Sequence, residues 1–274
     1  CLNGGDFINS CLQSIVNQSY SNYEIILFDN NSTDNSIKLA KKINTKKIKI
    51  YKSKKRLKLY AARNKAISKA TGKFLAFIDV DDTWLPKKIE KQVKRVYSEK
   101  SDVCYTNHWL VNGSKKIFSK NKLPFRNMTY EILNNYPICI STVLIKKDTF
   151  FKIKKFDKRY EIIGDFDFFY RISKKYKFSV LQEPLVKYLV HQKSTSIKKL
   201  NLRISEMNKW IKKNKNLKHL LQFDKIDQKN QYFNSSYFII NKRYVDFFNS
   251  LTKLKNIYVK FKLIIKMFYY LIFR

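Results

Sequence analysis

Three carboxylates stand within four residues of one another, directly after a strongly apolar run. The run covers residues 74–78, and Asp79, Asp81 and Asp82 follow it. Such a run is typical of a strand buried on both faces of a parallel sheet. In open α/β sheets, ligands bind beyond the carboxyl ends of the strands. Carboxylates at this density need a positive partner, and their hard oxygens suit Mg²⁺ or Mn²⁺. The spacing therefore predicts a divalent-cation site here.

A second interpretation of this acidic run is the start of a helix. Asp82 or Thr83 could cap a helix opened by Pro86, because short polar side chains and proline both favour helix N-termini. That interpretation accounts for Asp82. It gives no reason for Asp79 and Asp81 to flank a single residue directly after a buried strand.

Two more carboxylates occupy positions where an α/β fold could use them. Asp29 ends the apolar run 24–28, although an Asx-turn explains it equally well. Asp165 follows Gly164 and opens a helix that is apolar nearly all round, so the helix should be buried and should carry Asp165 and Asp167 inward. A buried carboxylate is costly unless it is paired or used. The competing interpretation of Asp165 is an N-cap.

A histidine and an arginine complete the set of candidates. His191 ends the predicted strand 185–190, but a lone histidine is more often a packed or solvated residue than a ligand. Arg63 lies within the predicted helix 59–70. It could be a solvated surface residue, or it could point at the acidic strand end or at a phosphate.

The elements that must position these side chains alternate between strand and helix patterns, which predicts an α/β fold. Residues 119–140 look irregular, and Gly72 looks like a C-cap glycine. Asp6 looks like the cap of the first helix. Predicted helices cover residues 7–18, 37–43, 59–70, 86–99 and 148–153. Predicted strands cover residues 24–28, 48–51, 74–78, 101–111, 115–118, 141–145, 178–181 and 185–190.

The length and the charge of the chain limit the classes of protein to which it can belong. At 274 residues and 44% apolar, it can form one α/β domain with an appendage. The net charge of +36 predicts attraction to polyanions. We attribute it mainly to a Lys-, Ile- and Asn-rich composition, with membrane attraction as a contributor. There is no RNA-recognition signature and no zinc spacing among the four cysteines, so we expect no nucleic-acid partner and a reducing compartment.

The two ends of the chain carry further expectations. Residues 1–5 look like a loop, so we expect that a first strand precedes them. From about residue 200 helical patterns dominate. Residues 257–274 are too short and too charged to cross a bilayer. They suit an interfacial helix with lysines on one side, or alternatively a terminal helix docked on the domain. We favour the membrane surface because the whole chain is cationic.

Taken together, the ordered motifs resemble those of the family 2 glycosyltransferases, which have the GT-A fold. A lone Asp-x-Asp triplet is weak, but the ordered set is specific and covers roughly residues 1–200. The motifs occur in residues 3–8, 11–20, 24–36, 61–64 (Ala-Ala-Arg-Asn), 79–84 (Asp-Val-Asp-Asp-Thr-Trp), 165–171 and 184–191.

The resemblance implies a fold and an activity. The fold would be a Rossmann-like mixed sheet flanked by helices in residues 1–200, followed by a helical tail in residues 201–274. Such enzymes move a sugar from a nucleoside-diphosphate sugar to an acceptor hydroxyl with inversion at the anomeric carbon. They use Mn²⁺ or Mg²⁺. The acceptor expected here is a glycan or a lipid-linked glycan, as in cell-surface polysaccharide synthesis on the inner face of the cell membrane.

The resemblance also assigns roles to the candidate residues. Asp29 would contact the nucleotide base and Asp79 the ribose. Asp165 would be the general base that deprotonates the acceptor. Arg63 matches an arginine near the nucleotide pocket. The remaining two candidates would bind the metal, namely Asp81 and His191.

The chain departs from the family pattern at several positions. The family often has a second acid where Asn30 stands and a glutamate where Gly164 stands. It usually has Asn and Gly where Arg56 and Lys58 stand. These departures leave the donor open, for example a UDP-sugar or a more anionic one. Three alternatives also stay open at this stage: a nucleotidyltransferase, a basic nucleic-acid-binding protein, and a degenerate transferase fold that only binds membranes.

Overall fold

The computed structural model describes residues 1–113, 115–118, 122–191, 199–217 and 221–273. The chain divides into two compact units. The first unit comprises residues 1–132 and 136–191, and the second comprises residues 133–135 and 192–274. All of the candidate site residues belong to the first unit. The assignment of a separate role to each unit stays a prediction.

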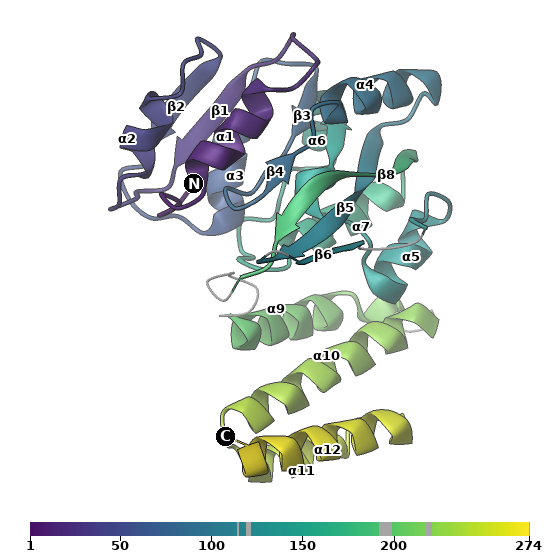
Figure 1. Ribbon diagram of the computed structural model, residues 1–274. Helices are drawn as coiled ribbons and strands as arrows, with labels where there is room; N and C mark the ends of the chain where they lie inside the picture. Colours follow the sequence, from purple (N-terminus) through teal and green to yellow (C-terminus); the bar gives the residue numbers. More distant parts are fainter. Residues whose placement is uncertain (114, 119–121, 192–198, 218–220, 274) are drawn as a thin grey trace. The chain divides into compact units, whose positions relative to one another are not determined.

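The first unit contains two sheets (Figure 1). One is a parallel pair, β1 (Ile25–Asp29) with β2 (Ile48–Lys52), in which Asp29 lies opposite Lys52. The other is mixed and runs in the order β3-β7-β5-β8-β4, with β6 paired to β5. Its strands are β3 (Phe74–Ala76), β4 (Thr83–Trp84), β5 (Val103–Asn112), β6 (Lys115–Phe118), β7 (Leu144–Lys146) and β8 (Phe178–Leu189).

Helices flank these sheets, and their apolar positions face inward. The helix α1 buries Ile8, Leu12 and Ile15 in a cluster with Ile25 of β1 and Trp84 of β4. Such burial of aliphatic side chains supplies most of the stabilisation that holds a helix on a sheet. The helices are α1 (Ile8–Val16), α2 (Ser36–Lys41), α3 (Leu59–Ile67), α4 (Lys88–Ser98), α5 (Met128–Asn135), α6 (Lys147–Lys152) and α7 (Gly164–Ser173), with a 3₁₀ turn at Ile140–Thr142.

The strand before the acidic run differs from its prediction. β3 spans three residues, only Leu75 of them is buried, and its ladder partner β7 is antiparallel. The expected five-residue strand, buried on both faces of a parallel sheet, is therefore wrong. After Ala76 the chain leaves the ladder, and Ile78 and Val80 pack against the α1 cluster instead. Their apolar character reflects that packing.

The two strands expected on either side of Pro184 form one strand. β8 runs parallel to β5 along its whole length, and the register shifts at Asn107, opposite Pro184. A proline cannot donate a ladder hydrogen bond and is tolerated at such a bulge. A single strand therefore runs from Phe178 to Leu189, and His191 follows two residues after its end.

Smaller differences concern the helix ends. Residues 128–135, expected to be irregular, form α5. Phe7 rather than Asp6 is the N-cap of α1, without a side-chain cap. α3 ends in Ser68 in a right-handed conformation, so Gly72 is not its C-cap. Exposed helix ends are satisfied by water as well as by caps, which makes cap residues weak boundary signals.

The second unit is helical. A hydrophobic cluster joins its last three helices, with Phe247 of α11 and Leu263 of α12 fully buried. Within the described residues, no helix is both long enough and apolar enough to cross a bilayer. The helices are α9 (Leu200–Lys213), α10 (Leu221–Ile240), α11 (Tyr244–Leu251) and α12 (Ile257–Phe273), with a 3₁₀ turn at Lys215–Leu217. Arg274, the last residue of the predicted tail, lies outside the described residues.

Candidate active site

The three carboxylates after β3 have three different partners. Asp79 forms an ion pair with Arg63, and its backbone N–H donates to the Ser141 hydroxyl at 3.1 Å. Asp81 Oδ2 lies 2.9 Å from His191 Nε2. Asp82 is almost completely buried. The acidic run thus supplies two partly exposed carboxylates and one internal one.

Asp82 is not a helix cap. It accepts from the Ser141 hydroxyl and, at 3.1 Å, from the Leu189 N–H, so it ties the acidic loop to the end of β8. α4 begins only at Lys88, with Lys87 as its N-cap. Burial, followed by the nearby charge of Asp79, raises the pKa of Asp82 to about 8. The helix-start interpretation is therefore wrong for this residue.

Arg63 connects α3 to the acidic loop. Its guanidinium pairs with Asp79 and lies 5.2 Å from the centre of the Tyr60 ring. Burial opposes its charge, but the charge of Asp79 raises the pKa of Arg63 above its ordinary value. Arg63 is therefore a fixed positive charge beside the acids, and it is not a solvated surface residue.

Asp81 and His191 are suitable partners for a divalent cation. One carboxylate oxygen and one imidazole nitrogen face each other, and both side chains are about one-fifth to one-quarter exposed. The described residues contain no group of three or more His, Cys, Asp or Glu side chains placed to hold a metal. Mg²⁺ and Mn²⁺ in nucleotide sites commonly use one or two protein ligands, with phosphate oxygens and water completing the shell. This donor pair fits that pattern.

Asp29 combines features of both of its interpretations. In support of the Asx-turn, its Oδ1 accepts from the Ser32 N–H at 3.0 Å. Its Oδ2 is buried and has no hydrogen-bond partner among the described residues. A buried carboxylate oxygen without a donor is costly, which makes this atom a candidate acceptor for a ligand. The next residue, Asn30, exchanges two 2.9 Å hydrogen bonds with the backbone of Leu57.

Asp165 lies in the first turn of α7, half-buried, and is not its N-cap. Each of its oxygens accepts from a tyrosine hydroxyl: Oδ1 from Tyr60 at 2.8 Å and Oδ2 from Tyr136 at 3.0 Å. Burial raises the pKa of Asp165, while the two phenols and the charge of Arg63 act in the opposite direction. A carboxylate with a raised pKa is suited to accept a proton near neutral pH.

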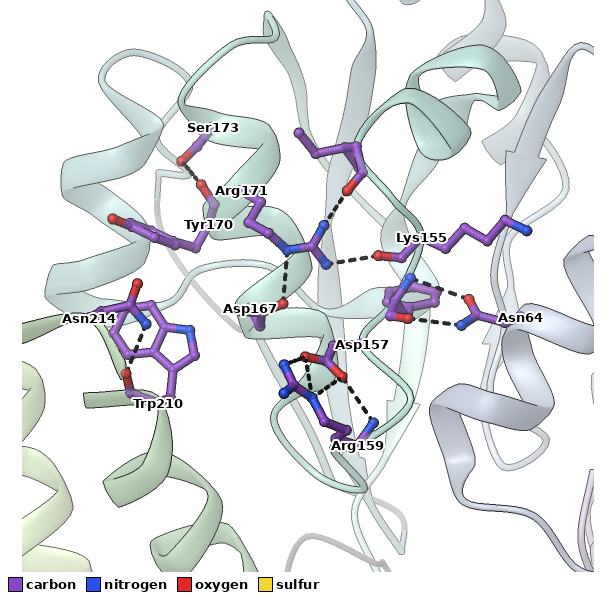
Figure 2. Close-up of polar contacts among 12 residues, drawn as sticks. Asn64, Lys155, Asp157, Arg159, Asp167, Tyr170, Arg171, Ser173, Trp210 and Asn214 are labelled. Carbon is purple, nitrogen blue, oxygen red and sulfur yellow. Dashed lines mark hydrogen bonds and ion pairs between the residues drawn. The ribbon is translucent and has the colours of Figure 1, made fainter. Parts of the chain in front are cut away.

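The other acid of α7 has a structural role. Asp167 is buried and pairs with Arg171 at 2.9 Å, one helical turn later. Arg171 also donates to the carbonyls of Ile153 and Lys155, and Figure 2 shows its contact with Lys155. The two hydrogen bonds to these carbonyls fasten α7 to the chain that precedes it, and Asp167 holds the guanidinium in place. Asp167 is directed inward, as expected, but it does not join the other acids.

Three contributors to the site were not predicted: Tyr60, Tyr136 and Ser141. The hydroxyl of each donates to a carboxylate that is distant in the sequence. A lone Tyr or Ser belongs to no motif with a recognisable spacing. Only the run of Ser141 and Thr142 between apolar residues hinted at buried polar groups.

Solved structures of known proteins share this fold. Staphylococcus aureus TarS, residues 1–349 in complex with UDP-GlcNAc, superposes with a TM-score of 0.66 at 18% identity. The match covers 91% of this chain and 77% of that one. A likeness at this level of identity confirms the GT-A fold, with its curled mixed sheet and flanking helices.

Sequence relatives agree with this fold. An uncharacterized glycosyltransferase of Methanocaldococcus jannaschii, MJ1057, is 28% identical over 203 residues, which is 71% of this chain and 69% of that protein. The UDP-Glc:alpha-D-GlcNAc-diphosphoundecaprenol beta-1,3-glucosyltransferase WfgD of Escherichia coli is 29% identical over 138 residues. That match spans 50% of this chain and 54% of WfgD. The family model described as glycosyl transferase family 2 matches residues 1–179. The chain therefore belongs to glycosyl transferase family 2, as its ordered motifs predict.

Proposed function

We propose that this glycosyltransferase moves a sugar, with inversion, from a nucleoside-diphosphate sugar to a hydroxyl of a glycan or lipid-linked glycan. The observation that carries the proposal is the arrangement around Asp165 and Arg63: a half-buried carboxylate with a raised pKa, and a fixed cation already paired with Asp79. The names of the relatives support the substrate class, because WfgD is a UDP-glucose transferase that acts on a diphosphoundecaprenol-linked GlcNAc.

The roles of the side chains follow from their chemistry. Asp165 accepts the proton of the acceptor hydroxyl as that oxygen attacks the anomeric carbon, because a free hydroxyl is a poor nucleophile at neutral pH. Arg63 offers positive charge where the leaving diphosphate becomes more negative, an interaction that is stronger in the transition state than in the ground state. Asp29 Oδ2 is an acceptor for the N–H of a nucleotide base, and Asp79 is an acceptor for a ribose hydroxyl.

Asp81 and His191 are the residues that would hold Mn²⁺ or Mg²⁺. When bound, such an ion neutralises charge on the leaving diphosphate and makes a separate acid unnecessary. The structure already brings these two donors together, because Asp81 Oδ2 lies 2.9 Å from His191 Nε2.

The test is a transfer assay with UDP-glucose and UDP-GlcNAc, using undecaprenyl-diphospho-GlcNAc as acceptor. We expect release of nucleoside diphosphate and a product of inverted anomeric configuration. Asp165→Asn should lower the rate by at least about a hundredfold. Asp157→Asn is the matched control, because Asp157 is a partly buried acid that pairs with the exposed Arg159, and it should retain activity. Release of pyrophosphate instead would identify a nucleotidyltransferase and reject the proposal.

We also propose that the outer face of α12 binds an anionic membrane surface, on the inner face of the cell membrane. Leu263 and Met267 are buried in the cluster of the second unit. Opposite them, Phe261, Ile265 and Phe268 are each at least half exposed, at the i, i+4, i+7 spacing of one helix face. The predicted one-sided pattern is thus incorrect, since α12 is apolar on two faces.

Charge supports an anionic lipid as the partner of this face. Lys260, Lys262 and Lys266 interrupt the apolar residues of α12, and the chain carries a net charge of +36. Lysines beside an exposed apolar face favour the interface of an anionic bilayer.

Vesicle sedimentation tests this part of the proposal. The double variant Phe261→Ser/Phe268→Ser should bind vesicles of phosphatidylglycerol and phosphatidylethanolamine at least tenfold more weakly than the unchanged protein. The control is Tyr97→Ser, an exposed aromatic side chain on α4. Unchanged binding by the double variant would show that this face does not contact lipid.

A further inference from the structure

The hydroxyls of Tyr60 and Tyr136 approach the Asp165 carboxylate from two different parts of the first unit. Tyr60 belongs to α3 and donates to Oδ1 at 2.8 Å. Tyr136 follows α5 and donates to Oδ2 at 3.0 Å. These residues lie 105 and 29 positions away from Asp165 in the sequence. One donor on each oxygen fixes both the position of the carboxyl group and the orientation of its plane.

The surroundings hold the two phenols in place. Tyr60 is almost completely buried, and its ring packs against that of Phe156 at 5.2 Å. The Tyr136 ring meets the edge of Phe166 at 5.6 Å. A tyrosine has few rotatable bonds, so a packed ring aims its hydroxyl with little loss of conformational entropy. Both donors are thus set before any substrate arrives.

Tyr60 also explains the departure from the family pattern at position 164. A Cβ atom on Gly164 would lie 2.4 Å from Cδ2 of the Tyr60 ring. No side chain therefore fits at position 164 while Tyr60 occupies its present place. The Tyr60 side chain thus accounts for two features: it donates to Asp165, and it leaves no room for an acid at position 164.

We propose that Tyr60 and Tyr136 are positioning residues that orient the Asp165 carboxylate and keep it ionised for proton transfer. The inference rests on the proposed role of Asp165 as the base. Each carboxylate oxygen has two lone pairs, so an acceptor hydroxyl can bind Asp165 while both phenols stay in place. Hydrogen bonds donated to a carboxylate stabilise its charged form and oppose the effect of burial.

Four side chains face Asp165 and enter its titration, and the backbone N–H of Phe166 also donates to its carboxylate. Tyr60 and Arg63 come from α3, and Tyr136 and Cys139 come from the segment between α5 and β7. Arg63 and the two phenols favour the carboxylate. Burial raises the pKa of the Cys139 thiol well above its ordinary value, so this group stays neutral. Removing one phenol therefore takes one donor from Asp165 and leaves its other donors in place, although the Tyr60 hydroxyl also lies 3.2 Å from the Ile162 carbonyl oxygen.

The variants Tyr60→Phe and Tyr136→Phe remove one hydroxyl each and keep the rings. We expect the acidic limb of the pH profile of kcat/KM to move to higher pH by about one unit in each variant, and further in the double variant. kcat should fall while KM for the donor stays unchanged. Tyr105→Phe is the matched control, because Tyr105 is as fully buried as Tyr60 and its hydroxyl donates to the Pro124 carbonyl. It should leave the profile in place.

A second measurement needs no activity. Carboxyl ¹³C NMR follows the titration of Asp165, whose signal is assigned by its loss in Asp165→Asn. In the absence of both sugar substrates, the titration midpoint of Asp165 should move to higher pH in the tyrosine variants, as the pH profile does. A shifted titration in a protein that transfers no sugar would support the positioning role and reject the proposed function. An unchanged titration midpoint in the double variant would overturn the inference, whatever the activity.

Discussion

Replacing Gly164 by alanine should destabilise the first unit through a single contact. The added Cβ would lie 2.4 Å from the Tyr60 ring, whereas ordinary van der Waals contacts begin at 3.4 Å. One of the two groups must therefore move by about 1 Å, and both are buried. Overpacking of this kind costs about 1–3 kcal/mol. The better helix propensity of alanine offsets up to about 1 kcal/mol. We expect a net loss of about 1–2 kcal/mol in the free energy of unfolding.

Removing the ring reverses the sign of this effect. In a Tyr60→Ala background the space above Gly164 is free, so Gly164→Ala should be neutral or stabilising by up to about 1 kcal/mol. A double-mutant cycle measured by urea denaturation isolates the contact, and we expect a coupling energy of at least about 1 kcal/mol. An equal cost of Gly164→Ala in both backgrounds would refute the explanation that Tyr60 requires glycine at this position.

Three further substitutions test other parts of the account. Burial lowers the pKa of Lys88 from 10.5 to about 7. Between these two pH values the unfolded chain binds more protons than the folded one, so the free energy of unfolding should rise with pH. Lys88→Met should remove this rise, measured as the urea midpoint at each pH. A rise that persists in the variant would show that Lys88 is not its cause. Arg171→Lys cannot keep all three contacts of the guanidinium and should cost about 2 kcal/mol on unfolding without moving the pH profile of transfer. Asp29→Asn keeps the acceptor for Ser32 and should weaken UDP binding about tenfold by calorimetry; unchanged affinity would remove Asp29 from the nucleotide site.

The sequence was informative where a pattern is local. The runs that became β1 and β2 were predicted within one residue, because each is a short, largely apolar run between polar segments. The buried character of α7 followed from its aromatic residues. The ordered set of motifs, rather than the acids alone, sufficed to identify the family.

What could not be predicted depends on contacts between distant parts of the chain. Asp82 looked like a helix cap because its true partners, Ser141 and the Leu189 N–H, lie 59 and 107 residues away. The phenols on Asp165 were invisible for the same reason. α5 was missed although Met128 and Ile132 share one face, because the prolines around it suggested a loop.

We propose that the acidic loop after β3 binds a nucleoside diphosphate together with a divalent cation. Thermal shift with UDP, GDP, CDP and ADP, each with Mn²⁺ and with EDTA, tests it most directly. A ligand at one hundred times its dissociation constant stabilises the folded state by about 2.7 kcal/mol, which is readily measured. We predict a shift with one nucleotide that needs Mn²⁺ and is lost in Asp81→Asn but kept in Asp157→Asn. A shift that is the same in EDTA and in Asp81→Asn, or none with any nucleotide, would contradict the account.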